Sequence, residues 1–276
     1  MLMAIAYIAP FLLALAGVVV VRWFAGAEHA SRWGGLAAAV GFFIGWQILV
    51  DPAWSPKTAH DRIGHIVLGA TLVGLAADVW PARRWLRTTL MLGLVLGSAW
   101  ISVSGGITLK TLPELGAAIA GVTLAIAWLG TAARYSMLRE QGATFSVIVV
   151  SGLLGVAVVA GVSGDAVVTK ATFAAASAWL GHAIGCRLVG VPPSWTALSL
   201  ATAATFAAAW ALAVGKPAAI PGLALLLFVL FADRTARRVP MPGGRISDFL
   251  YIAVLAGAAS IPVILAAVVT AARINQ

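Results

Sequence analysis

Charged residues are scarce in this chain, and almost none lies within its long apolar runs. Asp, Glu, Lys and Arg make up 10% of the 276 residues, whereas hydrophobic residues make up 62%. A soluble domain of this length could not hide so much apolar surface, because folding leaves a large part of any protein surface in contact with solvent. The composition therefore excludes an ordinary soluble protein and predicts one that is embedded in lipid.

Cysteine and recognisable catalytic motifs are scarce as well. The single cysteine, Cys186, excludes an internal disulfide. The sequence contains no H-E-x-x-H, G-x-S-x-G or Walker motif and no cluster of carboxylates. Ser163-Gly164-Asp165 would need a histidine partner that the sequence does not identify. These absences favour a protein that is not an enzyme.

Long apolar runs dominate the chain instead. A membrane-spanning helix needs about 20 mostly apolar residues, and it satisfies its backbone hydrogen bonds internally. We predict an all-α integral membrane protein, a single polytopic domain over residues 1–276 with short loops and about ten spans. The number could be as low as eight, because three of the runs are short. The predicted spans are 3–21, 33–50, 63–80, 88–101, 115–129, 145–160, 167–189, 197–214, 219–231 and 249–271.

The basic residues indicate how the chain is oriented. Twelve of the 18 Lys and Arg residues lie in or beside the odd-numbered connections between predicted spans. The positive-inside rule then places these connections in the cytoplasm and both termini on the outer face of a bacterial-type inner membrane. Anionic lipids of the inner leaflet account for the net charge of +9 without a nucleic-acid partner.

Two weak internal similarities suggest a repeated structure. V-S-G-G at 103–106 resembles V-S-G-D at 162–165, and A-D at 77–78 recurs at 232–233. They favour a chain built from helical hairpins, a common plan among membrane proteins. The alternative is that turns and span ends simply require such residues.

Small residues predict close helix packing. Gly41 and Gly45 are four residues apart and therefore share one helix face. Glycines in this arrangement allow two helices to approach closely in lipid. The pattern does not tell whether the second helix belongs to this chain or to a partner.

His182 and Cys186 form the only candidate polar site deep within a span. They are four residues apart on one helix face. An ionisable residue at that depth is costly to bury and is a functional hypothesis by default. We favour a histidine that is hydrogen-bonded to a neighbouring helix, and we assign no metal or cofactor. One alternative is that His182 and Cys186 share a soft metal or that His182 ligates haem, and another is a proton or substrate role for His182.

A second candidate cluster lies in the second connection, on the predicted outer face. Carboxylates and imidazoles at short spacing could hold a divalent metal, but interfacial polar residues are the favoured interpretation. The cluster consists of Asp51, His60, Asp61 and His65.

Two aspartates lie near the inner ends of predicted spans, where a carboxylate opposes the helix dipole. We predict compensating ion pairs with nearby arginines, and the alternative is a gate or coupling pair. The predicted pairs are Asp78 with Arg83 and Arg84, and Asp233 with Arg237 and Arg238.

The ninth connection, 232–247, is rich in arginine, and its prolines and glycines should stop the helix. Its arginines could contact lipid headgroups or an acidic partner surface, although orientation alone would also explain them. They are Arg234, Arg237, Arg238 and Arg245.

These observations favour a structural or accessory subunit of a larger membrane complex, with other membrane subunits as partners. A facilitative transporter or exporter of a neutral or lipophilic solute is the alternative, since helices interrupted near Pro221 or Pro262 could expose backbone polar groups. The length and span number resemble those of the drug and metabolite exporter superfamily, which usually keeps both termini inside. An enzyme acting on a lipid or quinone through His65, Asp61 or the arginines of the ninth connection is a third interpretation.

Overall fold

The computed structural model describes residues 2–51, 58–79, 89, 93, 142–240 and 245–275. Within these ranges 90% of the residues are helical and none forms a strand, so the all-α prediction is confirmed there. The predicted spans 88–101 and 115–129 lie almost wholly outside the described residues.

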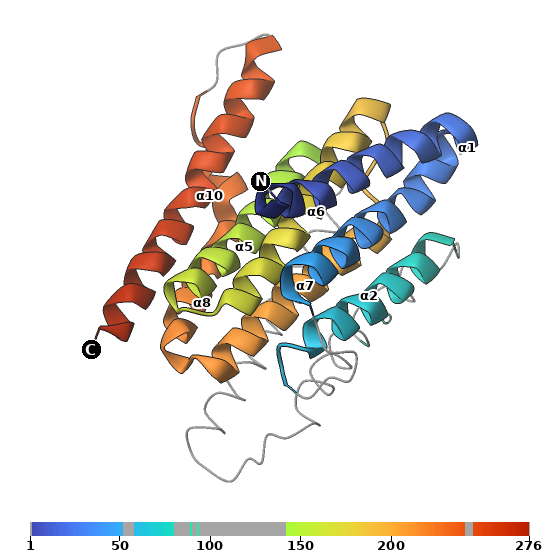
Figure 1. Ribbon diagram of the computed structural model, residues 1–276. Coiled ribbons are helices and arrows are strands. Elements are labelled where there is room, and N and C mark those ends of the chain that lie inside the picture. Colours follow the sequence, from blue (N-terminus) through green and yellow to red (C-terminus); the bar gives the residue numbers. More distant parts are fainter. Residues whose placement is uncertain are drawn as a thin grey trace.

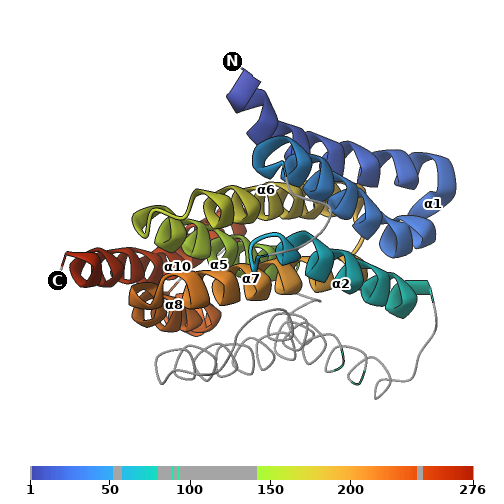
Figure 2. The same ribbon diagram turned by 60° about the horizontal axis from the view of Figure 1, so that its bottom comes forward.

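The first element, α1 (Leu2–Val50), is a hairpin of two antiparallel helices (Figures 1 and 2). The chain reverses at Gly26, whose φ of 86° lies in the left-handed region that glycine adopts without steric cost. The two halves pack closely, since a β-carbon at Gly41 would lie 2.6 Å from the Pro10 carbonyl oxygen. Gly45 also contacts Pro10. The predicted glycine face therefore packs within this chain.

The remaining described helices follow in order along the bundle (Figure 1). Asp165 accepts a hydrogen bond from the Val168 amide at the start of α6, and Ser194 does the same for Ala197 in α7. Gly190 ends α6 in the left-handed conformation. The helices are α2 (Arg62–Val79), α5 (Gly142–Val162), α6 (Ala166–Val189), α7 (Trp195–Gly215), α8 (Ile220–Leu226), α9 (Ala232–Ala236) and α10 (Arg245–Ile274).

Seven described segments are long and apolar enough to cross a membrane, which is compatible with a multi-pass protein. The predicted number of about ten is not established by these segments. α6 has 24 residues and is also long enough, but it is not one of these seven segments, because Lys170 and Arg187 make it less apolar. The segments are Tyr7–Ala30, Arg32–Val50, Arg62–Val79, Thr144–Val162, Trp195–Gly215, Pro217–Ala236 and Phe249–Ile274.

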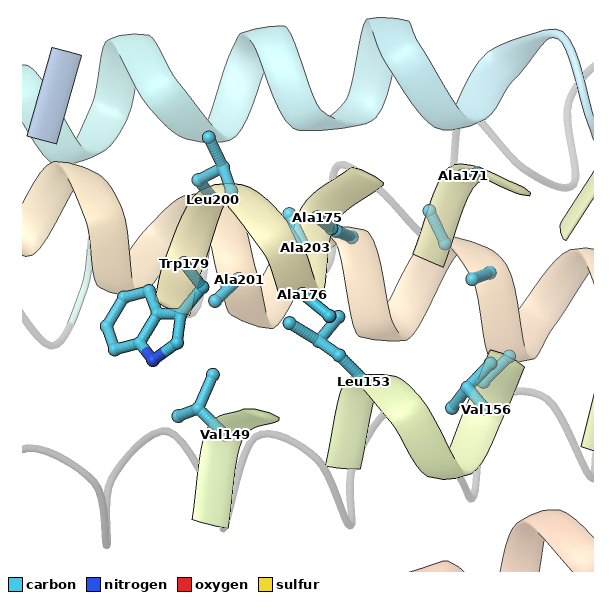
Figure 3. Close-up of a cluster of buried hydrophobic side chains, with 14 of the residues drawn as sticks. Val149, Leu153, Val156, Ala171, Ala175, Ala176, Trp179, Leu200, Ala201 and Ala203 are labelled. Atoms are coloured by element: carbon cyan, nitrogen blue, oxygen red, sulfur yellow. The ribbon is translucent and has the colours of Figure 1, made fainter. Parts of the chain in front are cut away.

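The helix α7 is the most completely buried of the seven membrane-length segments. In its most apolar stretch 94% of the residues are buried, whereas the share of buried residues is 17% in the first half of α1 and 17% in α10. It shares one cluster of buried hydrophobic side chains with α5 and α6, and Figure 3 labels Leu153, Trp179 and Leu200 from these three helices. An evenly apolar helix such as α7 can be buried on every side.

The closest helix contact joins α6 to the first half of α1. Small residues at four-residue spacing on α6 meet the backbone of α1 in parallel register. The Ser177 hydroxyl donates a 2.8 Å hydrogen bond to the Tyr7 carbonyl, and one turn later Gly181 lies against the Phe11 carbonyl. A β-carbon at Gly185 would lie 3.3 Å from the next such oxygen, in Leu15. Packing of this kind holds helices together where lipid removes the hydrophobic driving force.

One end of the bundle, the His60 end, gathers three connections. His60, which precedes α2, lies 2.8 Å from Asp165 between α5 and α6. A β-carbon at Gly215, the last residue of α7, would lie 3.7 Å from the His60 ring. The described parts of the second, sixth and eighth predicted connections therefore lie together.

The opposite end, the Gly26 end, gathers odd-numbered connections. Asp78 near the end of α2 accepts a hydrogen bond from the Thr196 amide near the start of α7. Gly35, shortly after the α1 turn, contacts Ser194 in the connection before α7. Alternate connections thus meet at opposite ends, as repeated crossing of a bilayer requires.

The ninth connection departs from its predicted boundaries. α9 continues the helical path to Ala236, and α10 begins at Arg245, four residues before its predicted start. The preceding segment is not one regular helix, because α8 is flanked by the 3₁₀ turns η1 (Pro217–Ala219) and η2 (Leu227–Phe231). The predicted span 219–231 is therefore helical but interrupted.

Candidate functional site

His182 lies at the junction of α6 with both halves of α1. Its side chain is completely buried. The ring makes a hydrogen bond with the backbone of Gly34, which belongs to the second half of α1. A β-carbon at Gly34 would lie 3.5 Å from the ring, so glycine permits this close approach. The hydrogen bond joins α6 to a neighbouring helix, and the structural role of His182 stays a prediction.

Cys186 lies beside His182, as their spacing predicts. The Cys186 sulfur is 3.4 Å from His182 Nε2, and the thiol is buried. A metal ion would need further ligands. The described residues contain no group of three His, Cys, Asp or Glu side chains that could hold one. The pair forms a buried polar contact within α6.

The predicted outer cluster separates into several local contacts. Asp61 accepts hydrogen bonds from the Thr58 amide and hydroxyl at 3.0 and 2.9 Å. His65 Nδ1 lies 3.2 Å from the carbonyl oxygen of Asp61 rather than from its carboxylate. Asp51 is exposed, 3.5 Å from the Gln47 amide nitrogen. These side chains do not converge on one ligand.

His60, the fourth member of this cluster, pairs with a residue far away in the sequence. Its Nε2 lies 2.8 Å from Asp165 Oδ2. The same aspartate caps α6 through Oδ1, which is 3.0 Å from the Val168 amide nitrogen. The Asp165 side chain is only 7% exposed and that of His60 is 30% exposed. One carboxylate therefore stabilises both a helix start and a contact between two connections.

The electrostatics of this pair favour its charged form. The hydrogen bond to Asp165 raises the pKa of His60 above its ordinary value of 6.5; burial opposes this effect, and the charges of Asp165 and Asp61 add to it. Burial alone would raise the pKa of Asp165. Hydrogen bonds from His60 and Val168 and the charges of His60 and Lys216 nevertheless hold it below 3.8.

Asp78 caps a second helix. Its carboxylate accepts hydrogen bonds from the Trp195 amide at 2.9 Å and from the Thr196 amide and hydroxyl, both at 2.8 Å. The carboxylate lies at the unfavourable end of the α2 dipole, but also at the favourable N-terminal end of α7. Its predicted partners Arg83 and Arg84 lie outside the described residues.

Asp233 and the arginines of α9 lie towards the Gly26 end. Asp233 is buried, whereas Arg234, Arg237 and Arg238 are exposed. The Arg234 guanidinium lies 5.5 Å from the centre of the Phe231 ring. The side chain of Arg245, at the start of α10, is outside the described part. The predicted ion pairs of Asp233 and the predicted lipid contacts of these arginines remain predictions.

The main contacts missed by sequence reasoning are the long-range partners of two aspartates. The Ser163-Gly164-Asp165 segment lacked an identifiable histidine, and the structure supplies His60, 105 residues earlier. Thr196 was not considered as a partner of Asp78. An aspartate before a helical run signals an N-cap, so the local role of Asp165 was recognisable, but its distant partner was not.

No protein-family model matches this chain, and no curated protein matches its sequence.

Proposed function

We propose that this protein is a non-catalytic structural or accessory subunit of a larger membrane complex. The proposal rests on one observation, namely the hydrogen bonds that its buried polar groups form. Ser177, His182 and Asp78 each bond to the backbone of a different helix segment, so they stabilise the bundle itself. Such contacts favour a rigid packing unit, which is what an accessory subunit needs.

The outer helix α10 supports lateral association. It packs on α5 and α8 at the edge of the described bundle (Figure 1). Its outward face carries small exposed residues, and nothing lies within 4 Å of a β-carbon placed at Gly257. Small residues on a lipid-facing surface allow another helix to approach closely. We therefore assign this face to a helix of another membrane subunit. The small residues are Ala253, Ala256, Gly257 and Ser260.

The orientation belongs to the same proposal. We place the Gly26 end, with the exposed arginines of α9, in the cytoplasm, and the His60 end with both termini on the outer face. Arg234, Arg237 and Arg238 would then contact anionic headgroups of the inner leaflet.

Cysteine cross-linking in the source membrane tests the subunit proposal. A photoactivatable maleimide on Ser260→Cys is expected to yield an adduct with one other membrane protein, because this position faces outward. Ala259→Cys is the matched control, since Ala259 is fully buried against the bundle. Cys186 is also buried and should not react before unfolding.

The adduct should co-purify in a constant stoichiometry, measured by native mass spectrometry after mild extraction. Adducts with lipid alone, or equal adducts from positions 259 and 260, would contradict the proposal.

A facilitative transporter is the second candidate, and the interrupted segment 217–236 favours it. The 3₁₀ turns η1 and η2 break the regular hydrogen bonding of a membrane-length segment. Transporters use interrupted helices at their substrate sites.

Solute flux distinguishes the two candidates. For a structural subunit we expect proteoliposomes to reswell in glycerol or urea at the rate of protein-free vesicles, measured by stopped-flow light scattering. Faster reswelling that Pro221→Ala slows and Pro262→Ala leaves unchanged would favour the transporter. Pro221 lies in the first turn of α8, inside the interrupted segment, whereas Pro262 lies within the continuous helix α10.

A further inference from the structure

The contact between His60 and Asp165 has the geometry of a switchable link. It joins two connections of the chain, one entering α2 and the other entering α6. The Nε2–Oδ2 distance of 2.8 Å is that of a charge-assisted hydrogen bond. The imidazole is the one partner whose charge changes near physiological pH.

The groups around the pair determine its response. On its own connection His60 faces the negative charge of Asp61, and from the α5–α6 connection it faces Asp165. Lys216, after α7, acts on Asp165 from the third connection. Two carboxylates thus attract one imidazolium, while the charge of Lys216 adds to the larger effects of His60 and Val168 that lower the pKa of Asp165.

We propose that His60 and Asp165 form a proton-dependent clamp that holds the α1–α2 connection against the α5–α6 connection and loosens as the pH rises. When His60 is protonated, the pair is a partly buried salt bridge. When His60 loses its proton, only a hydrogen bond from the neutral imidazole to the buried carboxylate remains. Partial exposure of the ring gives solvent protons access to it.

The sign of the pH dependence follows from both partners. The raised pKa of His60 means that its stabilisation is complete below 6.5 and is lost as the pH rises through the folded-state value. The lowered pKa of Asp165 means that its stabilisation is present above 3.8 and is lost as the pH falls through its own folded-state value. The clamp is therefore tightest between these two limits, in mildly acidic conditions.

Two conservative variants distinguish the contact of Asp165 with His60 from its role as the N-cap of α6. Asp165→Asn keeps an oxygen that can cap α6, since Asn and Asp are comparable N-caps, but it removes the charge. His60→Gln keeps a hydrogen-bond donor that does not titrate. Thermal unfolding of the full chain in nanodiscs is measured at pH 5.5 and pH 8.5 for each variant and for the double variant.

We expect the melting temperature of the wild type to fall by about 3 °C between these pH values, a size typical of a modest interaction in a chain of this length. The fall should disappear in His60→Gln, Asp165→Asn and the double variant, and the two substitutions should not be additive. A wild type without the fall, or a fall that persists in Asp165→Asn, would overturn the proposal. If neither variant folds, the NMR titration of His60 decides, and a value at or below 6.5 refutes the clamp.

Discussion

Gly181→Val is expected to be the most damaging single substitution in the described part of the chain. A β-carbon at this position collides with the Phe11 carbonyl oxygen, and the neighbouring atoms are also backbone. Backbone atoms cannot rotate aside as a flexible side chain can. The two helices must therefore separate, which would also disturb the Ser177–Tyr7 hydrogen bond one turn earlier.

We expect the free energy of unfolding of Gly181→Val to fall by about 3 kcal/mol, at the upper end of the usual range for overpacking. Intrinsic tryptophan fluorescence during denaturation in mixed micelles provides the measurement, since Trp179 lies two residues before the substitution and is fully buried. Gly181→Ala should have a smaller effect of the same sign.

Gly69→Val is the matched control for this prediction. It makes the same chemical change within α2, where nothing lies within 4 Å of an added β-carbon. Its stability should stay close to that of the wild type. Equal losses in the two variants would mean that helix propensity, rather than the contact between α1 and α6, explains the effect.

Asp78→Ala is the second substitution with a large expected effect. It removes the acceptor of three hydrogen bonds at the N-terminus of α7, from Trp195 and from the amide and hydroxyl of Thr196. Thr196 is fully buried, so its polar groups would lose their partner without access to solvent. Hydrogen bonds to a charged group contribute more than neutral ones, and we expect a loss of about 3 kcal/mol.

The loss of stability in Asp78→Ala can be compared with the loss in Ser194→Ala. It removes one neutral N-cap hydrogen bond from the same helix, at 3.1 Å from the Ala197 amide nitrogen, and should cost about 1 kcal/mol. Asp78→Asn should fall between the two alanine variants, because its amide has only one acceptor oxygen and no charge. A loss in Asp78→Ala no larger than that in Ser194→Ala would contradict the proposed cap, whichever denaturation assay is used.

The sequence by itself determined the class of the protein and most helix positions. In lipid, backbone groups must bond within their own segment, so a run of apolar residues becomes a helix whatever its neighbours are. For this reason α2, α5, α6 and α7 agree within a few residues with the predicted spans. The continuous helix predicted for 219–231 was less accurate, because the 3₁₀ turns arise from local packing and a proline.

The proximity of His182 and Cys186 also followed from sequence, because residues four apart on a helix are neighbours. The tertiary structure decided what those residues contact. No periodic pattern connects His60 with Asp165, Asp78 with Thr196, or Gly181 with Phe11, since each pair is separated by more than one hundred residues. The nearly complete burial of α7 could not be predicted either, because a helix that is apolar on every side carries no signal of which face is buried. Helix formation in lipid is a local requirement, whereas helix partners are chosen by the fit of distant surfaces.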